Sequence, residues 1–427
     1  MAHATEHTDA ESHADADFSL FDPRFRADPY PGYTRLHAAG RLRRTAFGAW
    51  ISPSYRVCSQ VLRDPRFGRP ELPEDGRTRS FLGLNPPDHT RLRRLAAKAF
   101  TPRLIEGLRP RIEELAEQLL DAALGQDGAQ EQGNVHGQDN AQEQGEFDLV
   151  AAFAHPLPVI VISELLGVPT EDRDRFTAWS DTLARALGPE YLLPPDALAE
   201  IDSTRGQFEA YFRELAAQRR VQPTDDLLSA LVAVCDDGEV LSEAELIATC
   251  TLLLIAGHET TVNLIANGTL ALLREPQRLA WFRAHPEAAP AVVEELLRFD
   301  PPVQLTMRTA LVDADVEGVP IAAGEQILLV IGAANRDPEV FADPDRLDFS
   351  RAENTGGSAG GTDRHLAFGL GIHFCLGAAL ARLEGQIALT AFARRVHEPE
   401  LATDEVSYRD NLILRGPASL PVRHRRG

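Results

Sequence analysis

The sequence predicts a mainly α-helical protein with small β-sheets, folded as one large domain around a long central helix. Three observations support this fold class. A run over residues 243–275 is apolar on nearly every side in its first half, so it must pass through the interior. The stretch 308–337 alternates in the manner of short strands. Finally, neither a GxGxxG nor a GxxxxGK[ST] motif occurs, so nothing indicates a nucleotide-binding domain.

The long helix has marked ends. Ser242 and Glu245 form a capping-box pattern, and Pro276 closes the segment. About thirty residues at 1.5 Å each give roughly 45 Å, which is longer than a small domain is wide. Apolar spacing also predicts helices over residues 104–124, 287–299 and 376–396, and turn glycines at 318 and 324 divide the alternating stretch into strands.

Three segments are expected to lie outside the folded core, which we place at residues 18–422. Residues 1–17 are polar, acidic and without periodicity, which predicts a disordered tail, and residues 423–427 form a short C-terminal tail. In residues 125–145 the stretch "GQDxAQEQG" occurs twice, offset by 12 residues, with a single aliphatic side chain, Val135. Two copies this polar cannot bury a face, so they predict a disordered surface insertion, most simply a recent duplication.

Composition narrows the class of protein. A net charge of −21 argues against nucleic acid or an anionic membrane as the main partner, because phosphate backbones are met by clustered basic residues. The 4 cysteines are far apart, which indicates a reducing compartment rather than a disulfide framework. The N-terminus has no apolar signal region, and the apolar run at 246–257 is too short to span a bilayer. We therefore expect a soluble, cytoplasmic monomer.

One cysteine lies in an unusual loop, "HLAFGLGIHFCLG", residues 365–377. Its glycines permit a tight backbone path and the close approach of something flat or bulky. A predicted helix follows directly, so Cys375 lies at a helix N-terminus, where backbone N–H groups and the helix dipole favour a thiolate. The alternative is that this lone cysteine is a small buried apolar residue.

The same loop matches the pattern FxxGxHxCxG, and on that match the chain resembles the cytochrome P-450 family, in its soluble bacterial form. The resemblance implies a haem b cofactor with Cys375 as the axial thiolate ligand of the iron. It also implies that Phe368 packs near the sulfur, that Gly369 and Gly377 adjoin the haem, and that His373 hydrogen-bonds a haem propionate.

A second motif, "AGHETT", interrupts the apolar central helix with a carboxylate and hydroxyls. Because a buried charge without a purpose is costly, Glu259 and Thr260 suggest a proton relay for oxygen activation. The resemblance makes Thr260 the oxygen-side hydroxyl and Glu259 its acid neighbour, with Ala256 and Gly257 beside the haem. The alternative is that the threonine bonds back to its own helix. We expect His258 to point away from the haem and to have a structural role.

Two further sets of residues are assigned by the resemblance. Glu295 and Arg298, three apart in "EELLR", form a buried structural pair, which Arg346 from "FADPDRLDF" is expected to complete. His89, Arg93 and Arg308 join His373 as contacts of the haem propionates. For His89 and Arg93 a plain surface stripe is the alternative. The neighbouring basic residues, expected either to dock an acidic electron donor or to be a solvated face, are Arg91, Arg94 and Lys98.

The substrate pocket is expected among segments that vary within the family. Aliphatic residues there suit a hydrophobic guest, and two polar ones could hydrogen-bond to it, although several of them could simply fill the core. The predicted pocket residues are Leu82, Val303, Gln304, Leu305, Thr306 and Ile413. Together with a strong preference for arginine over lysine, the resemblance suggests an actinobacterial enzyme that modifies a polyketide, peptide, alkaloid or terpenoid.

The resemblance therefore implies a monooxygenase that uses dioxygen and two electrons to hydroxylate or epoxidise such a substrate. No reductase module is attached, so the electrons are expected from a separate ferredoxin or flavin donor with its NAD(P)H reductase. The same haem chemistry could instead end in C–C or C–N coupling or in desaturation. A peroxide-driven enzyme fits less well, because the acid–alcohol pair is intact. A non-catalytic haem sensor or carrier would not need that pair.

Overall fold

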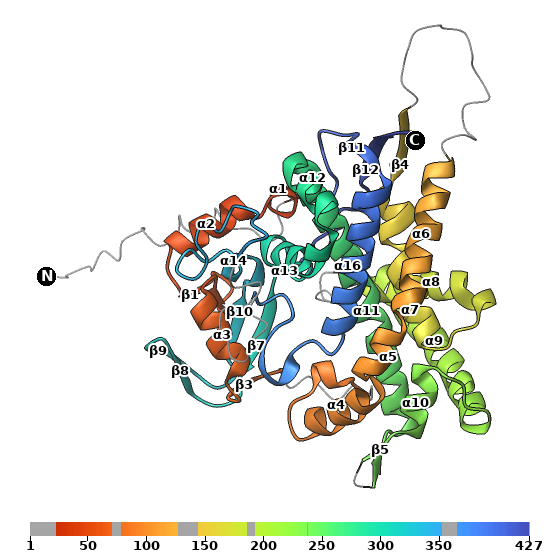
Figure 1. The fold of residues 1–427 in the computed structure, drawn as a ribbon. Helices are drawn as coiled ribbons and strands as arrows, with labels where there is room; N and C mark the ends of the chain where they lie inside the picture. Colours follow the sequence, from red (N-terminus) through yellow and green to blue (C-terminus); the bar gives the residue numbers. More distant parts are fainter. Residues whose placement is uncertain are drawn as a thin grey trace, which may run out of the picture.

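The structure is a computed structural model, and it describes residues 23–70, 78–126, 144–185, 193–236, 238–351 and 365–426. Within these ranges the chain is mainly helical with small sheets, which confirms the predicted fold class. Figure 1 shows a sheet-containing region formed by both early and late chain segments, beside a larger helical region. The long helix α11 and the late helix α16 run side by side where these two regions meet.

The main helices are α1 (Pro23–Ala27), α2 (Tyr30–Ala38), α3 (Tyr55–Arg63), α4 (Asp88–Ala99), α5 (Pro102–Gly107), α6 (Arg109–Gln126), α7 (Pro156–Leu165), α8 (Arg173–Ala184), α9 (Pro195–Val221), α10 (Leu227–Ala233), α11 (Glu243–Arg274), α12 (Pro276–Ala284), α13 (Ala289–Phe299), α14 (Ile331–Ala334) and α16 (Ala378–Arg395). Short 3₁₀ turns include η1 (Phe81–Gly83) and η7 (Gly371–His373), and the π-helical segment η2 (Val150–Ala154) precedes α7.

The largest sheet has the strand order β1-β2-β10-β7-β3, so it joins the beginning of the chain to residues 306–329. A second sheet has the order β11-β12-β4, and two hairpins complete the set. The strands are β1 (Arg43–Arg44), β2 (Trp50–Ser52), β3 (Phe67–Gly68), β4 (Gln144–Asp148), β5 (Cys235–Asp236), β6 (Glu239–Val240), β7 (Thr306–Ala310), β8 (Ala314–Val316), β9 (Val319–Ile321), β10 (Gln326–Leu329), β11 (His397–Leu401) and β12 (Pro421–Arg425).

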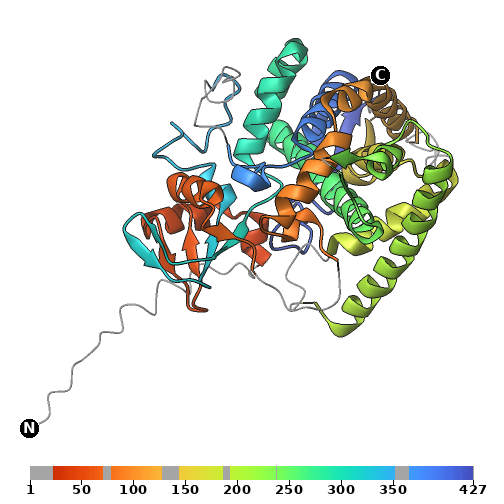
Figure 2. The same cartoon turned by 90° about the horizontal axis from the view of Figure 1, so that it is seen from below.

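Helix α11 forms the centre of the molecule, as predicted. The capping box is present: Ser242 Oγ accepts from the Glu245 backbone N–H at 3.3 Å, and the Glu245 carboxylate accepts from the Ser242 N–H at 2.8 Å. The helix packs against α7, α9, α13 and α16, and its second half is buried almost without interruption. Figure 2 shows it crossing the helical region between α9 and the cysteine-containing segment. Residues in this second half therefore face the interior or a cavity, whereas the helix ends at Glu243 and Arg274 are exposed.

Some predicted boundaries differ from the structure. The helix expected over 104–124 is divided into α5 and α6, because Pro110 lacks an N–H and is tolerated only in the first turn of a new helix. Helix α6 continues to Gln126 and β4 begins at Gln144, so both ends of the predicted insertion are regular structure, and its remainder lies outside the described residues. Strand β12 extends to Arg425, past the predicted domain end at 422.

The disordered tail predicted for residues 1–17 also lies outside the described residues. Among the described helices, none combines the length and the apolar character that crossing a bilayer requires.

Candidate active site

A cavity lies between α11 and the loop that precedes α16. Its walls are mostly apolar, and those contributed by α11 are Leu252, Leu253, Ala256, Gly257, Thr260, Thr261 and Leu264.

The cysteine loop forms the opposite wall. Cys375, Phe368, Gly369 and Gly377 all line the cavity, and the loop is closed by a 2.9 Å hydrogen bond from the Cys375 N–H to the Phe368 carbonyl. The turn requires glycine at position 371, where φ is +68° and an added Cβ would overlap the Leu62 carbonyl oxygen. Because α16 starts at Ala378, the sulfur lies at a helix N-terminus, as predicted.

The electrostatics of Cys375 differ from the expectation that the helix end alone favours a thiolate. The side chain is enclosed by protein but open to the cavity. Burial raises the pKa of the Cys375 thiol, and the Gly377 N–H and the nearby Arg93 and Arg382 only partly oppose this effect. A metal cation removes the proton of a coordinating thiol outright. A stable thiolate here thus needs a cation on the cavity side.

Two histidines at the edge of the cavity have no polar partners. The rings of His89 and His373 lie 4.3 Å apart, centroid to centroid, and all four of their nitrogens are buried without a hydrogen bond. Buried polar atoms in folded proteins are nearly always paired, so unpaired ones need an explanation. The surface-stripe alternative for His89 is wrong, since this side chain is buried.

Three arginines surround these histidines. Arg93 and Arg308, the predicted propionate contacts, line the cavity, and Arg69, which no sequence pattern marked, lines it too. Burial and the neighbouring Arg69 lower the pKa of Arg308 to about 9. Burial, followed by Arg69 and Arg308, lowers the pKa of His373 to about 3. None of the three arginines pairs with a carboxylate in the described part of the chain, so the cluster offers several positive charges to an anionic group in the cavity.

The acid and the alcohol on α11 point in different directions. Thr260 lines the cavity, and its hydroxyl donates to the Ala256 carbonyl at 2.8 Å, which is the back-bonded arrangement named above as the alternative. Glu259 is buried outside the cavity lining and forms an ion pair with Arg409, which no motif indicated.

His258 points away from the cavity, as expected. It is fully buried and contacts Ser180 and the Leu254 carbonyl, at 2.8 and 3.0 Å from its Nδ1.

The structural ion pair needs one correction. Arg298 and Glu295 are fully buried and doubly hydrogen-bonded at 2.8 Å, as predicted. The prediction that Arg346 completes the pair is wrong. The Arg346 side chain is more than half exposed and pairs with Asp348, and only its backbone carbonyl reaches Arg298. Arg351 takes the place instead, donating to Glu295 at 3.0 Å, because the chain turns back between the two arginines.

Three of the six predicted substrate-pocket residues, Leu82, Val303 and Thr306, line the cavity. Gln304, Leu305 and Ile413 are not among its lining residues in the described chain, so their assignment is wrong. Gln304 is buried against Tyr33, whose hydroxyl donates to it at 2.7 Å, and the two aliphatic side chains belong to the core cluster around that tyrosine. The segment around residues 186–192 lies outside the described residues.

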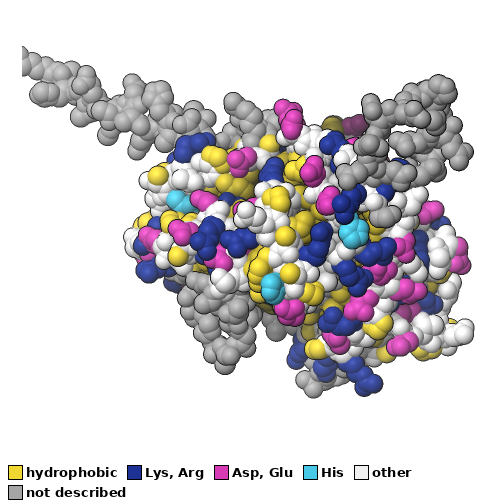
Figure 3. All heavy atoms as spheres, turned by 45° about the horizontal axis from the view of Figure 1, so that its top comes forward, with side chains coloured by type: hydrophobic (Ala, Val, Ile, Leu, Met, Phe, Trp, Pro, Cys, Tyr) yellow, Lys and Arg dark blue, Asp and Glu magenta, His cyan; other side chains and the backbone are white. Residues whose placement is uncertain are grey.

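The basic residues beside His89 are largely neutralised within the chain. Arg91 pairs with Glu245, and Arg94 pairs with Glu239 at 2.9 Å. Figure 3, which shows another face of the molecule, has acidic and basic side chains interspersed in the same way. The solvated-face interpretation of Arg91 and Arg94 is thus the better one.

Comparison with known proteins agrees with this geometry. Residues 61–280 and 283–415 match the cytochrome P450 family, and the chain belongs to that family. The enzyme is thus an oxidoreductase of the monooxygenase class, and the family implies a haem with cysteine thiolate ligation. The unpaired histidines, the unneutralised arginines and the cavity-facing sulfur all fit such a group.

Similar proteins come from several bacteria. Cytochrome P450 107B1 of Saccharopolyspora erythraea is 42% identical over 95% of this chain and 98% of that protein. Vitamin D(3) 25-hydroxylase of Pseudonocardia autotrophica is 41% identical over 94% of this chain and 95% of that protein. The structure of cytochrome P450 PksS, of the bacillaene polyketide synthase of Bacillus subtilis 168, has a TM-score of 0.82 and 38% identity, covering 95% of this chain and 99% of that one.

Proposed function

We propose that this enzyme holds haem b with Cys375 as the axial ligand and oxidises a hydrophobic small molecule in the cavity above it. One observation carries the proposal: the only cysteine that borders the cavity in the described chain shares it with a cluster of buried cationic and unpaired groups. A sulfur ligand at one wall and a site for two carboxylates at its edge together suit a haem.

Each part of the site has a separate task in binding. His89, His373, Arg93, Arg308 and Arg69 would pair with the two haem propionates, which removes the mutual repulsion of the buried cations. Phe368 would cover the sulfur, and its ring is itself held under Arg382, whose guanidinium carbon lies 4.4 Å from the ring centroid. Ala256 and Gly257 are small, so they leave room between α11 and the cofactor.

When bound, the haem supplies the activation of dioxygen, with two electrons from a separate ferredoxin-type donor and its NAD(P)H reductase. The residues of this chain control protons and water. Thr260 lines the cavity, and a hydroxyl oxygen can accept one hydrogen bond while donating another. Glu259 can supply protons to Thr260 only after the ion pair between its carboxylate and Arg409 has broken. The apolar walls exclude other water.

The chemistry of the walls supports a largely apolar substrate. Leu82, Val303 and Leu252 are aliphatic, and Thr306 offers one hydroxyl that accepts from Arg308 at 3.2 Å. A relative is named for 25-hydroxylation of vitamin D(3), and another for polyketide biosynthesis. We infer hydroxylation or epoxidation of a hydrophobic secondary metabolite such as a polyketide or terpenoid.

The first experiment is an optical titration of the purified enzyme with a panel of hydrophobic natural products. A thiolate-type resting spectrum that shifts toward high spin is expected with the correct substrate class. The Cys375→Ser variant should lose the thiolate-type spectrum of the reduced CO complex, whereas Cys250→Ser, at a buried cysteine outside the cavity, should keep it. Survival of that spectrum in Cys375→Ser would refute Cys375 as the ligand.

The outcome of the reaction is tested separately by product analysis with a redox partner and NAD(P)H. A product heavier by one oxygen atom is expected. A coupled or desaturated product would refute oxygen insertion while leaving the haem site intact, and the absence of turnover with every partner would support a sensor or carrier instead.

A further inference from the structure

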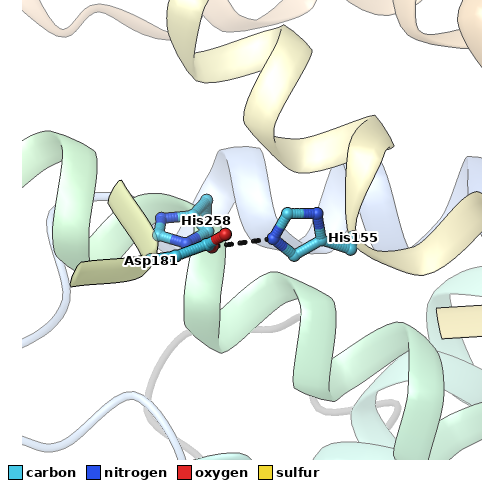
Figure 4. Close-up of side chains that lie close together, drawn as sticks. All are labelled: His155, Asp181 and His258. Carbon is cyan, nitrogen blue, oxygen red and sulfur yellow. Dashed lines mark hydrogen bonds and ion pairs between the residues drawn. The ribbon is translucent and has the colours of Figure 1, made fainter. Parts of the chain in front are cut away.

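A group of metal-ligating side chains lies on the other side of α11 from the haem cavity. It consists of His258 on α11, Asp181 on α8 and His155, the residue between η2 and α7. Figure 4 shows the three side chains converging from these separate elements. One ligand atom of each lies within 4.8 Å of the other two. From this geometry we propose that the three residues form a binding site for a zinc-type divalent cation.

The ligand atoms are of the right kind and close to the right spacing. Zn²⁺ prefers histidine nitrogen and carboxylate oxygen, with bonds of about 2.0–2.1 Å, so neighbouring ligands in a tetrahedral site are about 3.3 Å apart. His155 Nε2 and Asp181 Oδ1 are 3.0 Å apart, which is nearly that spacing. The third ligand atom lies within 4.8 Å of these two, and binding of an ion would draw it closer. Three protein ligands leave the fourth position for water.

The surroundings orient His258 for this role. Its Nδ1 lies 3.0 Å from the Leu254 carbonyl, one helical turn earlier, and we assign the Nδ1 proton to that bond. This tautomer leaves the Nε2 lone pair free for a metal. A carbonyl that holds the second ring nitrogen is the usual outer partner of a histidine ligand. The buried Ser180 hydroxyl lies closer to Nδ1, at 2.8 Å, than to Nε2, at 3.2 Å, so it can accept from the Nδ1 proton and leave Nε2 open.

The local charge also favours a cation. Asp181 and Glu259 are both carboxylates, and the Glu259 carboxylate lies 3.6 Å from His258 Nε2. Arg409 is the cation that pairs with Glu259. With two carboxylates and one arginine, these groups together carry a net negative charge in the absence of a metal. His155 and Asp181 are partly accessible to solvent, which gives an ion a way in.

Zinc binding is tested on the haem-loaded, full-length protein without an affinity tag, with zinc chloride as the probe. The experiment is equilibrium dialysis followed by metal analysis. The N-terminal histidines His3, His7 and His13 can bind zinc by themselves, so the comparison is between variants that all keep them. At a zinc concentration that fills the site in the wild type, the wild type should bind one more zinc ion per chain than His155→Ala or Asp181→Asn. Each substitution should lower the affinity for this ion at least tenfold.

A thermal-stability measurement and a control variant complete the test. Zinc should raise the melting temperature of the wild type but not of the two variants, because a ligand that binds only the folded state stabilises it. The control His285→Ala removes a histidine that stacks on Trp281, far from the site, and it should bind zinc as the wild type does. Equal zinc stoichiometry and equal melting shifts in wild type and both variants would refute the site. The haem spectrum reports the proposed function independently.

Discussion

Replacement of Arg351 by alanine is the most direct test of the corrected ion-pair network. Arg351 donates to Glu295 at 3.0 Å and to the carbonyls of Ala342 and Asp343 at 2.6 and 2.8 Å. It is therefore one of the links between α13 and the irregular segment around residues 342–351, together with Arg298 and the Asp348 N–H. Arg346, five residues earlier, is the matched control, because its side chain is mostly exposed and pairs only with Asp348 among the described residues.

The expected magnitudes differ clearly between these two variants. Removing one partner of a buried ion pair leaves an uncompensated charge and costs about 3–5 kcal/mol. Glu295 keeps Arg298 after the change, so we expect the lower end of that range, about 3 kcal/mol, for Arg351→Ala. An exposed pair contributes about 0–1 kcal/mol, so Arg346→Ala should lose less than about 1 kcal/mol.

The assay is urea unfolding of the haem-loaded enzyme, followed by haem absorbance and by far-UV circular dichroism. Coincident transitions by the two probes would justify the two-state free energies. Similar losses for the two variants, or a larger loss for Arg346→Ala, would show that the assignment of Arg351 is wrong.

Three other changes test the site. Thr260→Ala should keep haem and substrate binding but divert reducing equivalents to peroxide, and an unchanged ratio of product to NAD(P)H would contradict its role in proton delivery. Arg308→Gln should release haem at least several-fold faster to apomyoglobin, because a propionate loses its buried cation; Arg94→Gln, at an exposed pair, should not. Glu384 is buried at the cavity wall, and burial raises its pKa from 4.5 to about 8. The free energy of unfolding of the wild type should then fall as the pH rises from 4.5 toward 8, because Glu384 ionises at lower pH in the unfolded chain than in the folded one. Glu384→Gln removes this loss, so its stability relative to the wild type should rise by up to about 1.4 kcal/mol per pH unit over that range. A pH-independent stability difference in urea unfolding would refute this.

Features encoded in a short stretch of chain could be predicted from the sequence. The cysteine loop and the capping box of α11 depend on neighbours within about ten residues, so their spacing alone determines which groups can meet. The same is true of the Glu295–Arg298 pair, whose members lie on adjacent turns of α13. The placement of Cys375 opposite α11 then follows from the fold of the family.

Features decided by tertiary contacts could not be predicted in this way. The choice of Arg351 over Arg346 depends on how an irregular segment turns, and nothing in the spacing distinguishes them. Gln304 lies next to the cavity residue Val303 in the chain, but its amide is drawn into the core by Tyr33. Arg69 belongs to no motif, and only the fold brings it to the haem edge.

The segment that carries Arg409 ties the pocket wall to the helix behind it. Val303, a pocket residue, forms a β-bridge with Leu414, and the Gln304 N–H donates to the Ile413 carbonyl at 2.8 Å. The same segment closes on itself through a 3.1 Å hydrogen bond between Arg409 and Gly416, and Arg409 holds Glu259. A bulkier guest that pushes Val303 outward therefore also pulls on the partner of Glu259. Enlarging the pocket at position 303 should therefore change the ratio of product formed to NAD(P)H consumed as well as the substrate range. Variants that combine changes at residues 303 and 414 would separate these two effects.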